Sequence, residues 1–425
     1  MIGAIADDYT GATDVAVAFR REGLRTVLVF GVPATPPVLP PHDALVVALK
    51  SRTVPAADAV TQSLEALAWL REHGVELTYF KYCSTFDSTP EGNIGPVLDA
   101  LADELAADVV LQTPSSPEHL RTQYLGHLFV GDVLLSESHM RHHPLTPMTD
   151  SLLPRVLGQQ TSRRVSLIRQ STVRSGPEAI RAAAAQARAD GERYLLVDAI
   201  DAADLTRIGQ AVLDMPLVAG GAGLAAGIAA AIALSTPGSA RSAVDDTDPV
   251  GNQPAAVLAG SCSARTLEQI QVLKDSGRPC YLLDAVAVPD AEGLAEGALS
   301  WYDAQPPGPA PLIFSSLAPD QLHAVQAELG VQRSAEILEG AIGRIAVGLV
   351  ARGVRRIVSA GGETSGAVVT ALGVDGGQIG PEAATGVPWI YTTTADPLAL
   401  LLKSGNFGDA DLLRTASEAP EAATV

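Results

Sequence analysis

Short apolar runs alternate with longer helical patterns along almost the whole chain. In the first half, the runs fall at residues 2–6, 26–30, 44–48, 78–81, 109–112 and 194–197. The clearest helical patterns between them cover residues 56–72, 93–106 and 177–190. Continuous apolar runs are typical of strands buried on both faces, as in a parallel sheet covered by helices. The alternation therefore predicts an α/β fold with a largely parallel sheet.

A polar segment that contains three prolines, residues 235–254, interrupts this alternation. The apolar runs then restart at residues 255–259, 281–284, 312–315 and 356–360. A chain of 425 residues is long enough for two domains. The sequence thus predicts two α/β domains, residues 1–235 and 254–425, joined by a linker at 236–253, each with a largely parallel sheet. Because two-domain α/β enzymes commonly bind one reactant on each domain, we expect the active site in the interdomain cleft.

Two stretches depart from the pattern. Residues 114–154 are rich in Pro, His and Ser and too irregular for a βα repeat, so we expect a functional loop region there. Residues 217–234 contain no charge over 18 positions, the nominal length of a membrane span. They are mostly Ala and Gly, with glycines clustered at 220–223, so we expect a strand, a turn and a buried helix instead.

The charge balance limits the kinds of partner. The chain has 29 Lys and Arg against 48 Asp and Glu, a formal net charge of −19, and no basic run, which argues against nucleic acid. A small anion remains compatible if the few cations converge on one pocket. Cys83, Cys262 and Cys280 have no spacing typical of a disulfide framework or a zinc site. The N-terminus has no basic region and reaches two acids by residue 8, unlike a signal peptide, so we expect a cytoplasmic protein without a membrane partner.

Two adjacent carboxylates, Asp7 and Asp8, follow the first predicted strand. Ligands of open α/β sheets bind at the carboxyl ends of the strands, where this pair lies. Thr10 or Thr13 is a candidate cap for the next helix, and Gly11 a candidate for its tight turn. Alternatively, one of the two acids simply caps that helix. Since capping needs one acid and two neighbouring acids repel each other, we favour a functional site.

Cationic side chains follow two further predicted strands. Lys50 and Arg52 flank Ser51 after the strand at 44–48, and Lys81 follows the apolar run that ends at residue 80. An isolated lysine is usually a solvated surface residue. Two clusters at equivalent ends of one sheet instead favour a site for a carboxylate, to which Arg offers a planar fork and Lys a point charge.

The next segments supply hydroxyl groups and more cations. Residues 84–89 offer several hydroxyls and the carboxylate of Asp87, which suits a polyhydroxylated ligand. Arg121, Arg141 and the pair His142-His143 lie in the irregular region. Adjacent histidines rarely face one site, and no carboxylate stands at a helical spacing from them, so we assign no metal ligands.

Three glycine-bearing junctions mark the second predicted domain. Gly260 and Ser261 follow the strand at 255–259, Gly361 and Gly362 follow the strand at 356–360, and Gly405 lies near the end of the chain. Glycine at a strand–helix junction lets backbone N–H groups face outward, where the helix dipole favours phosphate. Each one alone is compatible with a plain turn, but three in one domain indicate a phosphate-bearing ligand. The P-loop pattern GxxxxGK[ST] is absent.

A dinucleotide-binding fold is the main alternative. Residues 221–226 fit G-x-G-x-x-A after a strand-like run, which would suit an NAD-dependent dehydrogenase. Asp245 and Asp246 stand at the distance of the ribose-binding acid, but no predicted strand precedes them. The pattern alone is weak support for this alternative.

Residues 5–14, IADDYTGATD, together with residues 361–366, GGETSG, resemble the four-carbon acid sugar kinases. The likeness covers almost the whole chain and keeps the family's order of motifs. Residues 50–52, 80–89, 92–95, 140–144 and 146–150 are similar to the 3-oxo-tetronate kinase branch. That branch has Asn-Gly before the arginine of Arg121-Thr122, and Ser at position 222. This chain has His119-Leu120 and Ala222 instead.

The resemblance implies an N-terminal sugar-acid domain, a C-terminal ATP domain, and transfer of a phosphoryl group from ATP, with Mg²⁺, to the terminal C4 hydroxyl of 3-oxo-tetronate. By motif position, the ATP-binding residues would be Ser261, Ser359, Gly361, Gly362, Glu363, Thr364 and Gly405. We expect the sugar acid to be bound by Lys50, Ser51, Arg52, Lys81, Asp87 and Arg121. Asp7 or Asp8 would orient or deprotonate the attacking hydroxyl, and Glu363 would contact the metal or the ribose.

Several alternatives stay open at this point. Within the kinases, the alternative substrate is threonate or erythronate. A sugar-acid binding protein without catalysis would normally carry an export signal, which is not found here. A homo-oligomer is compatible with the sequence.

Overall fold

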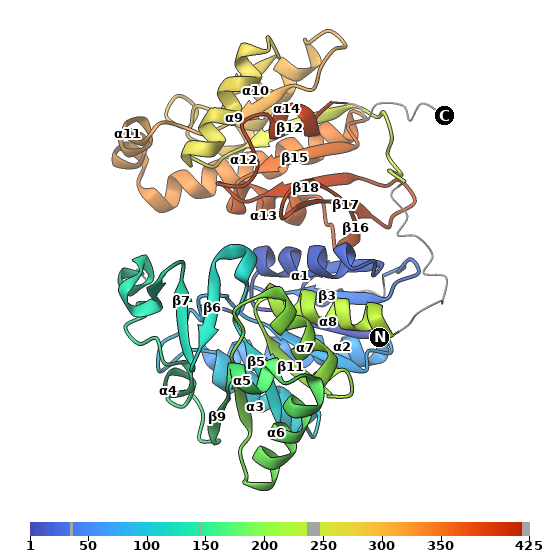
Figure 1. Cartoon of the computed structure of the whole chain (residues 1–425). Helices are drawn as coiled ribbons and strands as arrows, with labels where there is room; N and C mark the ends of the chain where they lie inside the picture. Colours follow the sequence, from blue (N-terminus) through green and yellow to red (C-terminus); the bar gives the residue numbers. More distant parts are fainter. Residues whose placement is uncertain (35–36, 144–145, 236–246, 419–425) are drawn as a thin grey trace. The chain divides into compact units, whose positions relative to one another are not determined.

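The computed structural model describes residues 1–34, 37–143, 146–235 and 247–418. The chain divides into two units, Met1–Asp245 and Asp246–Val425, and each contains its own sheet (Figure 1). Of the predicted linker at 236–253, residues 236–246 lie outside the described residues. Residues 247–253 form no helix or strand.

The sheet of the first unit is parallel throughout, in the order β2-β3-β1-β4-β11-β5-β10-β9. Its strands are β1 (Ile2–Ala6), β2 (Thr26–Phe30), β3 (Ala44–Ala48), β4 (Leu77–Lys81), β5 (Val110–Thr113), β9 (Val165–Ile168), β10 (Tyr194–Val197) and β11 (Leu217–Gly220). The α-helices are α1 (Tyr9–Arg21), α2 (Ala56–Glu72), α3 (Ile94–Glu104), α4 (Leu153–Leu157), α5 (Gln170–Arg174), α6 (Pro177–Ala189), α7 (Ala202–Val212) and α8 (Ala222–Ser235).

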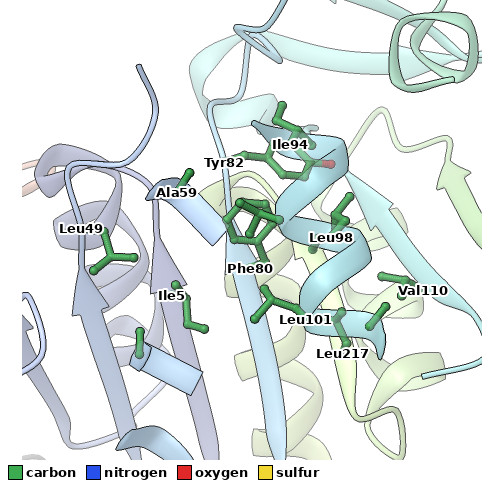
Figure 2. Close-up of a cluster of buried hydrophobic side chains, with 14 of the residues drawn as sticks. Ile5, Leu49, Ala59, Phe80, Tyr82, Ile94, Leu98, Leu101, Val110 and Leu217 are labelled. Carbon is green, nitrogen blue, oxygen red and sulfur yellow. The ribbon is translucent and has the colours of Figure 1, made fainter. Parts of the chain in front are cut away.

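The core of the first unit lies between this sheet and its helices. Ile94, Leu98 and Leu101 occupy one face of α3, because their spacing matches the helical period. They pack with Phe80 of β4 and with Tyr82, which follows it (Figure 2). All five side chains are buried. This packing holds the carboxyl end of β4 beside the first turn of α3.

The region at 114–154, expected to be an irregular functional loop, contains a small antiparallel sheet. Its strands are β6 (Arg121–Tyr124), β7 (His127–Val130) and β8 (Val133–Leu134), accompanied by the 3-10 helices η1 (Pro117–His119), η2 (Leu135–Glu137) and η3 (His139–His142). The turn between β6 and β7 has positive φ at both Leu125 (+50°) and Gly126 (+76°). The buried carboxylate of Asp198, just after β10, accepts hydrogen bonds from both of their N–H groups, at 2.8 and 2.9 Å. A distant acid therefore stabilises a turn that its own sequence does not favour.

The second unit has a mixed sheet in the order β13-β14-β12-β15-β18-β17-β16. The first five of these strands run parallel, and β17 is antiparallel to both of its neighbours. The strands are β12 (Ala255–Ala259), β13 (Cys280–Leu282), β14 (Leu312–Phe314), β15 (Arg356–Ala360), β16 (Gly376–Ala384), β17 (Val387–Thr392) and β18 (Ala399–Lys403). The α-helices are α9 (Ala264–Asp275), α10 (Ala291–Asp303), α11 (Pro319–Leu329), α12 (Val331–Ala351), α13 (Gly362–Ala371) and α14 (Leu412–Ala416). Both units thus have the predicted α/β class with largely parallel sheets.

The uncharged stretch at 217–234 forms β11 and α8, as expected. Within the described residues, no helix has the length and apolar character needed to cross a membrane. Helix α8 instead packs against α7, and glycines set their distance. A Cβ on Gly209 would lie 2.5 Å from the Gly227 carbonyl carbon, and one on Gly227 would lie 2.5 Å from the Leu205 carbonyl carbon. The glycines therefore serve close backbone packing.

We expect Gly227→Ala to lower the free energy of unfolding by about 1–2 kcal/mol. The added Cβ meets backbone atoms that cannot rotate away, and the overpacking cost exceeds the gain in helix propensity. Urea denaturation measures the change. Gly308→Ala is the control, because its Cβ would meet nothing closer than 3.7 Å. A Gly227→Ala protein as stable as the control would contradict this account of the α7–α8 contact.

Candidate active site

In the first unit, the predicted acids and cations meet at one edge of the sheet. Strand β1 lies between β3 and β4, and Ala6 pairs with Ala48 of β3 and with Lys81 of β4. Asp7 and Asp8 follow β1, residues 50–52 follow β3, and Lys81 is the last residue of β4. Because parallel strands end at the same edge, segments far apart in sequence are brought together there.

Asp7 and Arg52 form a two-point ion pair. Arg52 donates from Nε to Asp7 Oδ2 at 2.9 Å and from Nη2 to Asp7 Oδ1 at 2.8 Å. The Asp7 side chain is 8% exposed. Burial raises the pKa of the Asp7 carboxyl above its usual range, and the Arg52 guanidinium opposes this rise. Both carboxylate oxygens of Asp7 are therefore occupied by Arg52.

Asp8 performs the capping role that we expected of Thr10 or Thr13 and that the alternative interpretation gave to one of the two acids. Its Oδ1 accepts from the Gly11 N–H at 2.9 Å and from Arg52 Nη2 at 2.7 Å, which caps helix α1. The Thr13 hydroxyl instead donates to the Tyr9 carbonyl at 3.0 Å, within the helix. Among the described residues, Asp8 Oδ2 has no hydrogen-bond partner, and the side chain is 31% exposed. Asp8 thus keeps one carboxylate oxygen accessible.

Lys81 is buried beside this carboxylate pair. Its Nζ donates to the Tyr82 carbonyl at 2.8 Å, which leaves two of its N–H groups for other acceptors. A Cβ on Gly11 would lie 2.6 Å from Lys81 Nζ. Gly11 leaves room for this close approach and does not form the tight turn that we expected, since it lies inside α1. Asp14, one turn further along α1, is close enough for the Lys81 charge to oppose the rise that burial causes in its pKa.

The segment after β3 is held by Asn93. Its Nδ2 donates to the carbonyls of Ser51, Arg52 and Val54 at 2.6, 3.1 and 2.9 Å. Ser51 is buried, whereas Lys50 is exposed, with Nζ 4.8 Å from the centre of the Tyr9 ring. Asn93 thus fixes the backbone that carries Arg52, a role that its residue type alone did not reveal.

Asp87 and Arg121 have local partners. Asp87 accepts from the Thr85 hydroxyl at 2.5 Å. Arg121 donates from Nη1 to the His119 carbonyl, and within the described ranges it shares no hydrogen bond or ion pair with Asp7, Asp8 or Lys81. The structure therefore does not join Arg121 directly to the carboxylate pair. Its preceding residue, Leu120, adopts a left-handed φ of +59°, which a glycine would adopt at lower cost.

The dinucleotide pattern at 221–226 has a packing role. A Cβ on Gly221 would lie 2.6 Å from the Pro114 carbonyl oxygen, and one on Gly223 would lie 2.9 Å from Ser116 Cα. The Gly223 N–H donates to the Ser116 hydroxyl at 3.1 Å. Protein backbone therefore fills the space beside these glycines that a pyrophosphate would need. Asp245 and Asp246, the acids of that alternative, lie outside the described residues.

In the second unit, the three glycine junctions also meet at one sheet edge. They follow β12, β15 and β18, which are adjacent and parallel. Gly361 has φ +130°, and a Cβ added to it would lie 3.0 Å from the Ser261 N atom and 2.9 Å from Thr364 Oγ1. A Cβ on Gly405 would lie 2.6 Å from Ser261 Oγ. Ser261, Gly361, Thr364 and Gly405 thus form one cluster, here called the glycine cradle.

The other predicted nucleotide residues differ in position. Gly362 and Glu363 begin helix α13 and are exposed. Ser359 lies inside β15, fully buried, and its hydroxyl accepts from the Ser365 hydroxyl at 3.1 Å. Ser359 therefore supports α13 from beneath and is not accessible to a ligand in this conformation.

Sequence reasoning missed Lys403, the last residue of β18. It is 1% exposed, and its Nζ donates to Gly405 O and Thr266 Oγ1 at 2.8 and 3.0 Å. The signal that singled out Lys81, a lysine at the end of an apolar run, is also present here. The run at 399–402 was not identified as a strand, so this lysine was not placed at the sheet edge.

The cradle suits a phosphate-bearing nucleotide. Helix α13 begins at Gly362, directly after Gly361, and neither glycine has a side chain to cover the N–H groups of its first turn. The N-terminus of a helix favours phosphate. Among the described residues, no group of three or more His, Cys, Asp or Glu could hold a metal ion.

A surface cleft of about 360 Å³ lies at the opposite edge of the first unit's sheet. It is lined by Asp108, Arg163, Arg164, Arg188, Gly191, Glu192 and Arg193. Arg164 pairs with Glu192 at 2.5 Å and donates to the Asp190 carbonyl at 2.8 Å, while Arg193 pairs with Asp103 at 2.6 Å. These arginines neutralise acids and the carbonyls at a helix C-terminus. The cleft is therefore a poor anion site.

Comparison with protein families assigns a type to each unit. Residues 2–228 match the sugar-binding N-terminal domain family, and residues 256–413 match the nucleotide-binding C-terminal domain family. The first match contains the site of Asp7, Asp8, Arg52 and Lys81. The second contains the glycine cradle.

Curated relatives and solved structures align along nearly the whole chain. A 3-oxo-tetronate kinase of Cupriavidus necator is 48% identical over 97% of this chain and 95% of its own length. The enzyme of that name from Haemophilus influenzae is 42% identical over 98% of this chain and 99% of its own. The crystal structure of a Salmonella typhimurium protein with a provisional tRNA synthase name has a TM-score of 0.89 and 41% identity, covering 98% of both chains. The crystal structure of a Haemophilus influenzae protein has a TM-score of 0.87 and 41% identity, covering 97% of this chain and 98% of its own.

We expect Asn93→Asp to lower the free energy of unfolding by about 2–4 kcal/mol. The change removes a donor shared by three carbonyl oxygens and places a carboxylate against them. Thermal unfolding at neutral pH measures the loss. Asn252→Asp is the matched control, because Asn252 is exposed. Equal stability of the two variants would show that Asn93 does not hold the segment after β3.

Proposed function

Because the chain belongs to the four-carbon acid sugar kinase family, we propose that it transfers a phosphoryl group from ATP to the terminal C4 hydroxyl of 3-oxo-tetronate. The product would be 3-oxo-tetronate 4-phosphate. The observation that carries this proposal is the alignment, over nearly the full chain, with relatives named 3-oxo-tetronate kinase. A reaction that consumes ATP also suits the cytoplasmic location expected from the sequence.

The first unit would bind the sugar acid at the edge formed by β3, β1 and β4. Lys81 supports this assignment because its ammonium has two N–H groups free to bind a carboxylate. Exposed Lys50 would add a second cation. Arg52 has Nε and Nη2 bonded to the two acids, so its main role would be to position them, with Nη1 left for the substrate. Ser51, Asp87 and Arg121 remain candidates for contacts to the rest of the ligand.

We assign the proton-accepting role to Asp8. Its Oδ2 is free and its side chain is partly exposed, whereas both oxygens of Asp7 are bonded to Arg52. A general base must reach the proton that it abstracts. Asp7 would instead hold Arg52, and through it Asp8, in place.

The proposed step conserves atoms and charge. The C4 oxygen of the sugar acid forms a bond to the γ-phosphorus of ATP, and the bond from that phosphorus to the β–γ bridging oxygen breaks. The hydroxyl proton passes to Asp8 Oδ2, and ADP leaves. Such transfer depends mainly on positioning and on neutralising charge, which is what both strand-end sites supply.

The second unit would hold ATP at the glycine cradle. Backbone N–H groups of residues 362–364 and the hydroxyls of Ser261 and Thr364 are its candidate donors to phosphate oxygens. Glu363 is exposed at the same helix start, where it would contact the metal or the ribose. Mg²⁺ bound with the nucleotide would neutralise phosphate charge.

The substrate prediction is tested by a coupled ADP-release assay with Mg·ATP. The panel comprises 3-oxo-tetronate of either hand, threonate, erythronate and buffer alone. We expect turnover on one 3-oxo-tetronate to exceed that on threonate and erythronate by roughly 100-fold or more, because a site built to bind a particular polar group discriminates strongly. Preferred turnover of threonate or erythronate would overturn the proposed substrate. No turnover of any acid would overturn the proposed reaction.

The two acids should differ in their effects on turnover. We expect Asp8→Asn to lower kcat by roughly 100- to 10,000-fold with little change in KM for ATP, because the base is removed. Asp7→Asn should lower kcat less and raise KM for the sugar acid, since it loosens Arg52. Steady-state kinetics on folded proteins measures both. Near-normal kcat in Asp8→Asn would show that Asp8 is not the base.

A further inference from the structure

Lys403 is a buried cation beneath the glycine cradle. It ends β18, next to β15, and its own carbonyl accepts from the Gly361 N–H at 2.9 Å. Its ammonium donates to Thr266 Oγ1 at 3.0 Å, to Ser404 O at 3.1 Å and to Gly405 O at 2.8 Å. An ammonium has three N–H groups, so Lys403 has none left for a ligand. Lys403 can therefore act on a ligand through the groups that it holds and through its charge, but not through a direct hydrogen bond.

The Gly405 carbonyl oxygen receives three donors. Besides Lys403, the Ser263 hydroxyl donates to it at 2.6 Å and the Thr266 hydroxyl at 2.8 Å. These bonds turn the carbonyl inward. Because a trans peptide is planar, the N–H of Asn406 points the opposite way. Asn406 is exposed, and in the described part of the chain its N–H has no acceptor.

We propose that Lys403 is a positioning residue of the nucleotide site. It holds the Gly405–Asn406 peptide so that the Asn406 N–H faces the phosphates, and it places a buried positive charge beneath them. This inference rests on the proposed use of ATP.

Electrostatics supports the second part of this role. Burial, and to a lesser extent the nearby cation of Arg265 on α9, lower the pKa of Lys403 to about 8. Among the described residues, no carboxylate is paired with Lys403. Phosphate near the ammonium would favour its charged form, so protonation and nucleotide binding reinforce each other. Nucleotide affinity is therefore greatest below pH 8 and falls as the pH rises through that value.

The test measures the Kd of MgADP by titration calorimetry between about pH 7 and pH 9.5, with KM for ATP and kcat measured alongside. In Lys403→Met, we expect Kd at pH 7 to rise on the order of 10- to 100-fold and to lose its dependence on pH near 8. KM for ATP should rise by more than kcat falls. A merely structural lysine would not change the pH profile of nucleotide binding.

Two further variants keep the test decisive. Thr266→Val removes a donor to Gly405 and a partner of Lys403 without changing charge, so Kd should rise roughly tenfold while the pH dependence remains. Arg278→Met is the matched control. It removes another buried cation of the same unit, which donates to Ser417 Oγ at 3.0 Å and lies outside the cradle. It should lower Tm and leave Kd unchanged.

The outcomes distinguish a failure of the positioning role of Lys403 from a failure of the proposed ATP-dependent function. Folded Lys403→Met with the wild-type Kd, or with the pH dependence retained, would overturn the positioning role. If Lys403→Met does not fold, a wild-type Kd in Thr266→Val overturns it. If the wild-type protein binds nucleotide and the variants have the same Kd and pH dependence, only this inference is contradicted. A wild-type protein that binds no nucleotide contradicts the proposed function as well.

Discussion

Strands that run parallel all end at the same edge of their sheet, and the candidate sites of both units depend on this constraint. In the first unit it brings Asp7, Arg52 and Lys81 together, although they are more than 70 residues apart at the extremes. In the second it brings the segments after β12, β15 and β18 together in the same way. Helices that begin at this edge direct their N–H groups toward it, which adds positive potential where anions would bind.

Much of this arrangement could be predicted from sequence, because it depends on local patterns. Buried strands at 2–6, 44–48 and 255–259 appear as continuous apolar runs, and the structure places strands at the same residues. The antiparallel strands were missed for a physical reason. Strand β16 includes Gly380-Pro381 and bulges against β17, so it shows no alternation of apolar and polar residues. The β6–β7 turn has a leucine at a position that glycine or asparagine normally occupies, and Asp198 stabilises it from over 70 residues away.

The candidate residues were easier to locate than their roles. Asp7 and Asp8 are visible as adjacent acids after a strand, but sequence alone cannot show that Arg52 binds both of them. The expectation that Thr10 or Thr13 caps α1 was wrong, because both lie inside the helix, whereas Asp8 immediately precedes it and its carboxylate reaches the Gly11 N–H. Ser359 was expected at the nucleotide and is buried inside its strand. Roles depend on which side chains meet across the fold, and such contacts have no local signature.

The two sites differ in the kind of atom that forms them. The donors proposed for the glycine cradle are mostly backbone N–H groups, and its glycines leave no room for a side chain. Exchanging one side chain for another can damage such a site, but it can hardly change which ligand the site binds, because few side chains contact the ligand. The site at β3, β1 and β4 is made of side chains, with exposed Lys50 at its margin. Substitutions there can change which ligand fits while the backbone stays the same. If the proposed sites are correct, a lineage with this fold is free to vary its acceptor while the half proposed to bind phosphate stays constant.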